Sequence, residues 1–294
     1  MFLRNSTMSM LYNNIKTVLF LGGLTALMLW FGSFFGQGGL IFAFILAFVM
    51  NVVGFFFSDK IAIMSVGAKE VGPEHPLHRI VGELANRANL PVPRVYVSPI
   101  QAPNAFATGR SPSHAAVCAT QGLLQMLTPN EIAGVMAHEL AHVKHRDILI
   151  QSVAVTIGGA ISMLAQSMMF FGMGGRHADD EDAPNPLVML ALALLAPIAA
   201  MLIQMAISRS REYNADKYGA ELTGDPMDLA TALEKIHLMA ARIPVNVNPA
   251  MNTMFIAEPR NLMKSVGNLF QTHPPLEKRL MNLIGRPSTG MAFA

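Results

Sequence analysis

The chain has 294 residues, of which 52% are hydrophobic and only 14% are charged. Soluble globular domains carry about 25% charged residues, so this composition argues against an ordinary soluble protein. The formal net charge of +2 gives no reason to expect a nucleic-acid partner. The single cysteine, Cys118, excludes a disulfide within the chain and is compatible with a reducing compartment.

Two apolar runs near the N-terminus, at 17–36 and 40–58, approach the roughly 20 residues that a helix needs to cross a bilayer. Only the residues Gln-Gly-Gly separate them, so we expect residues 1–58 to form a hairpin of two transmembrane helices. A cleaved signal peptide is the weaker interpretation, because the second run follows at once and no small-x-small cleavage site precedes it.

Residues 59–147 are expected to form the first part of a mixed α and β domain. Apolar residues at helical spacing predict a helix over 76–90, and alternating β-prone residues predict strands at 94–98, 104–109 and 114–120.

A further helix is expected to begin after Thr128, because Thr128, Pro129 and Glu131 have the pattern of a capping box. We expect this helix to continue without a break through 136–150.

Two more apolar runs, at 148–172 and 186–208, predict a second transmembrane hairpin within 148–208. The alternative is a pair of buried helices in a soluble core, since both runs contain polar residues. Lys and Arg gather beside the same ends of all four runs, whereas the loop at 174–185 is acidic. The excess of basic residues on cytoplasmic loops therefore predicts that both termini, 59–147 and 209–294 face the cytoplasm.

Residues 209–294 are expected to form the second part of the same domain. Helical spacing is evident over 225–242 and 275–284, whereas 243–260 has no clear period. The predicted fold class is therefore mainly α with a small β-sheet, joined to about four transmembrane helices.

The sequence His138-Glu139-Leu140-Ala141-His142 has the spacing H-E-x-x-H. On a helix the two histidines lie one turn apart on the same face and can bind a single Zn²⁺. Glu139 is then placed to take a proton from a water molecule at the metal. The competing interpretation is a solvated polar helix face.

A catalytic zinc needs a third protein ligand, and two residues are candidates. His145 lies about 10 Å along the same helix from His138, too far to share an ion with both other histidines. Glu212 is the better candidate, because two antiparallel membrane helices would bring it to the height of His142. Asp216 follows Glu212 by about one helical turn and could hydrogen-bond a ligand histidine.

Four segments together resemble the M48 zinc metallopeptidases: HELAHVKHRD, SRSREYNAD, PNAFATG and THPPLEKRL. The resemblance covers nearly the whole chain. It implies a gluzincin-type core with one zinc ion, held by His138, His142 and Glu212, and Glu139 as the catalytic base. With four spans it also implies a protease of the bacterial cytoplasmic membrane that degrades misfolded or damaged membrane proteins during stress.

Other residues are assigned more loosely. His273 is our candidate for a second hydrogen-bond donor to the oxyanion of the reaction. A histidine before two prolines is equally consistent with an ordinary turn residue. Arg279 could assist His273 but is expected to be structural. Asn104, Ala105 and Phe106 are expected on a sheet edge that binds substrate, with an interior strand as the alternative.

Three rival functions remain as alternatives. A processing peptidase with one defined substrate would be expected to have more membrane spans. An intramembrane protease is disfavoured, because Lys144, Arg146 and Asp147 adjoin the motif and charges are costly inside a bilayer. A scaffold that retains a zinc fold would not need Glu139.

Overall fold

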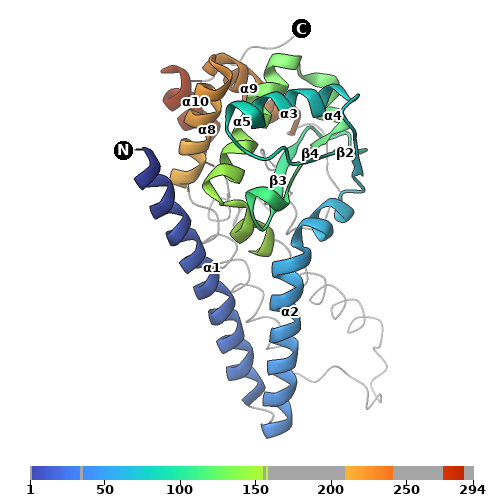
Figure 1. Cartoon of the computed structure of the whole chain (residues 1–294), viewed down its shortest axis with the longest axis vertical. Helices are drawn as coiled ribbons and strands as arrows, with labels where there is room; N and C mark the ends of the chain where they lie inside the picture. Colours follow the sequence, from blue (N-terminus) through green and yellow to red (C-terminus); the bar gives the residue numbers. More distant parts are fainter. Residues whose placement is uncertain (1, 34–35, 155–156, 158–208, 241–273, 288–294) are drawn as a thin grey trace, which may run out of the picture.

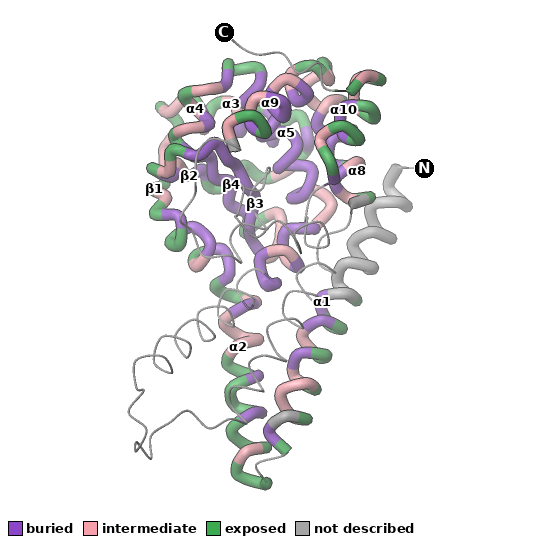
Figure 2. Tube along the Cα trace, turned by 180° about the vertical axis from the view of Figure 1, so that it is seen from behind, coloured by how far each residue is buried: buried purple, intermediate pink, exposed green. Residues whose placement is uncertain are grey.

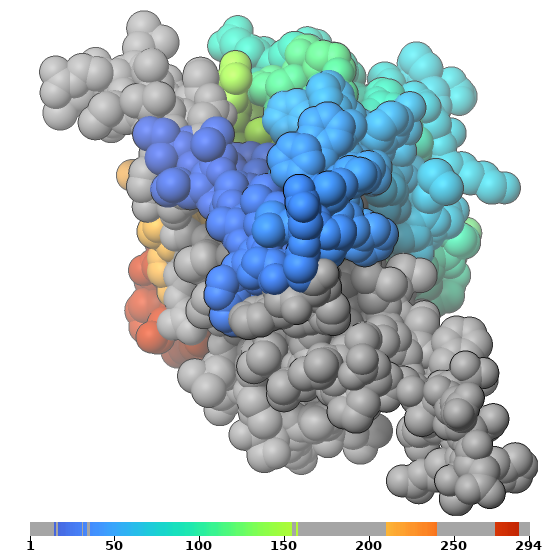
Figure 3. All heavy atoms as spheres, turned by 90° about the horizontal axis from the view of Figure 1, so that it is seen from below, coloured from blue at the N-terminus to red at the C-terminus, as the bar shows by residue number. Residues whose placement is uncertain are grey.

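The computed structural model describes residues 2–33, 36–154, 157, 209–240 and 274–287. Two long N-terminal helices, α1 (Phe2–Ser33) and α2 (Gly36–Ser65), form an antiparallel hairpin that projects from a domain of helices and one sheet (Figure 1). The two helices converge at their connected ends, and an end-on view shows them packed side by side (Figure 3). Asn51 Nδ2 on α2 donates a hydrogen bond of 2.9 Å to Thr25 Oγ1 on α1.

Within the described part of the chain, α2 is the one helix that is long and apolar enough to cross a membrane, with a mean hydropathy of 2.6. Only 17% of its apolar stretch is buried, and large apolar side chains such as Phe42 and Phe48 are exposed. Figure 2 shows α2 mostly in the colours of exposed and intermediate residues. The apolar stretch of α1, Thr17–Trp30, is shorter. Of the third and fourth apolar runs, only residues 148–154 and 157 lie within the described residues.

The domain contains a four-stranded sheet in the order β1-β2-β4-β3. Its strands are β1 (Lys69–Glu70), β2 (Arg94–Ser98), β3 (Ala105–Gly109) and β4 (Ala115–Thr120). β2 and β4 are parallel, whereas β1 and β3 run antiparallel to their neighbours. The three strands expected from the sequence are therefore present within a residue of their predicted bounds, and β3 lies at an edge.

Alternation along β4 assigns each face of the sheet to a different set of helices. Ala115, Val117 and Ala119 belong to the main core, which they share with α3 (Pro76–Arg87), α4 (Gln121–Met126), α5 (Pro129–His145) and α9 (Pro226–Ala240). Ala116 and Cys118 face the opposite way and pack against the end of α2. The sheet thus connects the N-terminal hairpin to the rest of the domain.

Helix α5 lies at the centre of the domain and contacts α3, α9, β3 and α8 (Arg209–Thr223), with α10 (Leu276–Ile284) packed against α8 and α9. Its start confirms the capping-box prediction. Thr128 Oγ1 accepts from the Glu131 amide at 3.4 Å, and Glu131 Oε2 accepts from the Thr128 amide at 2.8 Å. The predicted helices at 76–90, 225–242 and 275–284 correspond to α3, α9 and α10.

The prediction of an unbroken helix through 136–150 is wrong. Helix α5 ends at His145, Arg146 adopts a left-handed conformation with φ 59°, and helical backbone resumes at Ile148. The Asp147 amide instead donates to the carbonyl of His142 at 3.0 Å, which closes a tight turn. This turn brings the Asp147 side chain back toward the H-E-x-x-H segment.

Candidate metal centre

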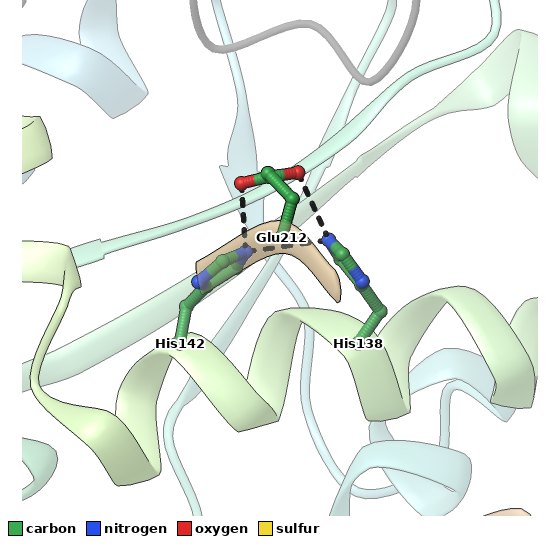
Figure 4. A group of neighbouring side chains, drawn as sticks. All are labelled: His138, His142 and Glu212. Carbon is green, nitrogen blue, oxygen red and sulfur yellow. Dashed lines mark hydrogen bonds and ion pairs between the residues drawn. The ribbon is translucent and has the colours of Figure 1, made fainter. Parts of the chain in front are cut away.

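Three buried side chains converge between α5 and α8 (Figure 4). Nε2 of His138 lies 3.3 Å from Nε2 of His142. The Glu212 carboxylate reaches both rings, with Oε2 at 3.8 Å from His138 Nε2 and Oε1 at 3.5 Å from His142 Nε2. One ligand atom from each residue can be chosen so that all lie within 4.8 Å of one another.

This arrangement suits a tetrahedral metal ion. Two nitrogens bound at about 2.0–2.1 Å to one such ion would lie about 3.3 Å apart, which matches the observed separation of the two Nε2 atoms. Two imidazoles and a carboxylate are also donors that zinc accepts. The surrounding charge favours a cation as well. Burial alone would lower the pKa of His142, but Asp147, Glu212 and Glu139 together raise it to about 9.

Helix α8 can lie close to the histidines because a glycine faces α5 at this contact. A Cβ atom on Gly219 would lie only 3.0 Å from the backbone nitrogen of His138. The close contact holds Glu212 and Asp216, both 1% exposed, against the histidine face of α5.

Each histidine has a carboxylate beside its second ring nitrogen. Asp216 Oδ1 lies 2.9 Å from His138 Nδ1, and Arg279 of α10 donates to both Asp216 oxygens, at 2.9 and 2.6 Å. Burial alone would raise the pKa of Asp216, but the charge of Arg279 and the hydrogen bond with His138 hold it below its usual value. Asp216 is therefore charged at neutral pH, as its bidentate contact with Arg279 requires.

Asp147 lies beside the second ring nitrogen of His142 in the same way, and it is not among the site residues expected from the sequence. Its Oδ2 lies 3.2 Å from His142 Nδ1, and Arg211 Nη1 lies 3.5 Å from its Oδ1. Burial would raise the pKa of Asp147, but the hydrogen bond and charge of His142 lower it. The sequence offered no glycine, asparagine or proline to signal the turn at Arg146 that directs Asp147 toward the site.

Glu139 is buried beside His138, His142 and Glu212, which are called the metal group below, and it is held by the sheet. Its Oε2 accepts a hydrogen bond of 2.8 Å from the backbone N–H of Ala107 on β3. Because this N–H donates to a residue of α5, it points away from β4. The edge of β3 that lies opposite β4 therefore faces α5. Ala105 and Phe106 lie on this strand, and Asn104 directly precedes it and pairs with Thr120 of β4.

The remaining candidates fall outside the group. The His145 ring packs against Tyr218, with ring centroids 5.6 Å apart, and burial lowers the pKa of His145. Arg279 contacts Asp216 rather than a residue of the converging group. His273 lies outside the described residues. Cys118 offers no nucleophile, because burial raises the pKa of its thiol to about 12.

Comparison with known proteins gives a consistent result. The model for peptidase family M48 matches residues 73–286. A protein named Protease HtpX homolog from Burkholderia ambifaria is 49% identical over 286 residues, covering 95% of this chain and 99% of its own. A namesake from Desulfatibacillum aliphaticivorans is also 49% identical, covering 95% of this chain and 92% of its own.

Among solved structures, S. mikatae Ste24p has a similar fold, with a TM-score of 0.52 and 20% identity over 95% of this chain and 67% of that one. The chain therefore belongs to peptidase family M48, a family of metalloproteases.

Proposed function

We propose that the protein is a membrane-bound, zinc-dependent endopeptidase that hydrolyses peptide bonds in misfolded or damaged membrane proteins at the cytoplasmic face of the bacterial inner membrane. The observation that carries this proposal is the position of Glu139. This carboxylate is buried beside a group of three converging metal donors and is oriented by the edge strand of the sheet.

His138, His142 and Glu212 would hold one Zn²⁺. A zinc ion there would supply a Lewis acid that polarises a peptide carbonyl and lowers the pKa of water to about 7. Asp216 and Asp147 prepare the two histidines for this task. Each aspartate lies beside Nδ1 of its histidine and would accept a hydrogen bond from it, which would fix the tautomer and leave the Nε2 lone pair for the metal.

Glu139 would act as the general base and then as the general acid. Its Oε2 is occupied by the Ala107 amide, so Oε1 is the atom that we expect to receive the proton of the attacking water. The same carboxyl group then delivers that proton to the nitrogen of the departing amine. We propose His273 as a second donor to the oxyanion.

The substrate would bind as an added strand along the edge of β3 that faces away from β4. The N–H of Ala107 points away from β4, and strand alternation gives the backbone groups of Ala105 the same direction. An extended peptide can therefore pair with Ala105 through main-chain hydrogen bonds, whereas Asn104 and Phe106, whose backbone groups face β4, would flank this contact. Recognition of backbone rather than side chains suits a protease that acts on many unfolded segments.

The membrane placement is supported by the exposed apolar surface of α2 and by the composition of the chain. We propose four spans, with the lipid bilayer as a constant partner and with both termini in the cytoplasm. The role in quality control and stress response is proposed from the resemblance of the motifs, and the relatives named Protease HtpX homolog support the protease activity.

The proposal is tested by incubating the purified chain, in detergent, with an unfolded protein substrate. We expect cleavage that a zinc chelator abolishes and that added Zn²⁺ restores. Cleavage that persists after complete removal of the metal would contradict the proposed chemistry.

A further inference from the structure

A second concave site lies where α2 enters the domain. It is a cavity of about 630 Å³, within the roughly 300–1,000 Å³ typical of small-ligand sites. One wall is the end of the apolar part of α2, with Phe56, Phe57 and Lys60. Arg94, at the start of β2, and Arg110, directly after β3, also line the cavity. None of these residues belongs to the metal group.

The cavity carries an excess of positive charge. Arg94 is paired with Asp59, at 2.7 Å between Nη2 and Oδ2. Lys60 and Arg110, by contrast, have no carboxylate within 4.0 Å among the residues that the structure describes. Their charged groups lie instead over aromatic rings, Lys60 at 5.6 Å from the centre of Phe57 and Arg110 at 5.8 Å from the centre of Phe56. Two cations are thus available to an anionic ligand.

The apolar surface of α2 leads directly into this cavity. Large side chains are exposed along the helix, including Phe42 at 68%, Phe48 at 61% and Phe56 at 49%. Lys60 follows Phe56 by about one helical turn. This end of α2 packs against the sheet through Ala62, and Figure 1 shows α2 entering the domain beside the strands. A helix that leaves the hydrocarbon core there would place the cavity at the height of the lipid headgroups.

We propose that this cavity binds the phosphodiester headgroup of an anionic phospholipid, whose acyl chains lie along the exposed face of α2. Arg and Lys are the side chains that bind phosphate, and basic residues at a membrane surface attract anionic lipids. The aromatic rings would contact the glycerol and the upper acyl chain. The proposal rests on the membrane position of α2 and does not depend on peptide hydrolysis.

The test uses the full chain carrying Glu139→Gln, purified in detergent. Because this variant is expected to lack proteolytic activity, the lipid measurement does not depend on whether the chain is a protease. Binding of phosphatidylglycerol and of phosphatidylcholine with the same acyl chains is measured by native mass spectrometry. We expect preferential binding of phosphatidylglycerol. Substituting Lys60→Gln and Arg110→Gln should weaken it by about fivefold for each charge removed.

The matched control is Lys69→Gln with Arg79→Gln, which removes the same charge from exposed positions outside the cavity and should leave binding unchanged. Arg110→Lys, which keeps the charge, should retain most of the binding and shows that any loss is not due to misfolding. Equal binding of both lipids, or equal loss in the cavity and control pairs, would overturn the proposal. Displacement of the lipid by an equal concentration of glycerol 3-phosphate would assign the site to a soluble phosphate compound and overturn it too.

Discussion

At the scale of single residues, Glu212 is the assignment with the most consequences. It is 1% exposed and its two oxygens face the two histidines. Glu212→Ala should lose most of the bound zinc, because two histidines alone leave the ion with too few protein ligands. His145→Ala should keep it, because the His145 ring lies against Tyr218 instead. Metal analysis of the purified variants decides between them, and the reverse pattern would refute the ligand assignment.

The contact of 2.9 Å between His138 Nδ1 and Asp216 Oδ1 gives a second prediction at this scale. Asp216→Asn should weaken zinc affinity by about 10–100-fold, because the tautomer of His138 is no longer fixed by a charged partner. The measurement is a titration against a zinc chelator of known affinity. Asp225→Asn is the control, since Asp225 is exposed and caps α9, where Asn serves equally well. Identical affinities for Asp216→Asn and the unaltered chain would exclude this role for Asp216.

The residues of the site were predictable from sequence to different degrees. The spacing of His138, Glu139 and His142 depends only on helix periodicity, so it was visible without a structure. Glu212 and Asp216 required an argument about two distant segments. Asp147 could not be found, because its role depends on the left-handed backbone at Arg146, a residue that rarely adopts this conformation.

At the scale of secondary-structure elements, the site depends on how closely α8 packs against α5. Gly219→Ala should push the two helices apart, since the new Cβ would meet the backbone of His138 at 3.0 Å. We expect lower thermal stability and weaker zinc binding, because α8 carries Glu212 and Asp216. Calorimetry and zinc titration measure both effects.

Gly82→Ala provides the control at this scale. Gly82 lies within α3, and a Cβ there meets nothing within 4 Å. Alanine in an open helical position should be neutral or stabilise the fold by about 0.5–1 kcal/mol. If Gly219→Ala behaves like Gly82→Ala, close packing at Gly219 is not what holds the site together.

Elements with a regular period were predicted well, and short or irregular ones were not. The Thr128 cap and the alternation along 114–120 identified α5 and β4 from sequence alone. The two-residue strand β1 and the short helix α4 have too few residues to show a period. The break between α5 and the helix that follows was missed, because the apolar run after Asp147 resembles a continuation of α5.

At the scale of the whole molecule, residues 148–208 separate the two halves of the metal site in the sequence. We expect these residues to form a membrane hairpin. A reporter fused near Asp180 should therefore be active outside the cytoplasm, and one at the C-terminus inside it. Alkaline phosphatase reports a position outside the cytoplasm, and a fluorescent protein reports a position inside it. Fusing each reporter to both positions measures the orientation of both. Cytoplasmic signals from both positions would contradict a spanning hairpin.

The measurement that tests the central claim most directly compares the unaltered chain with Glu139→Gln. Both proteins are purified in detergent, loaded with zinc and given the same unfolded substrate. We expect the variant to bind zinc fully and to lose activity by about 10²–10⁴-fold, the usual contribution of general acid–base catalysis. Equal cleavage by both proteins would exclude Glu139 as the base. Cleavage by neither, at full zinc occupancy and with intact folding, would contradict the assignment of this chain as a protease.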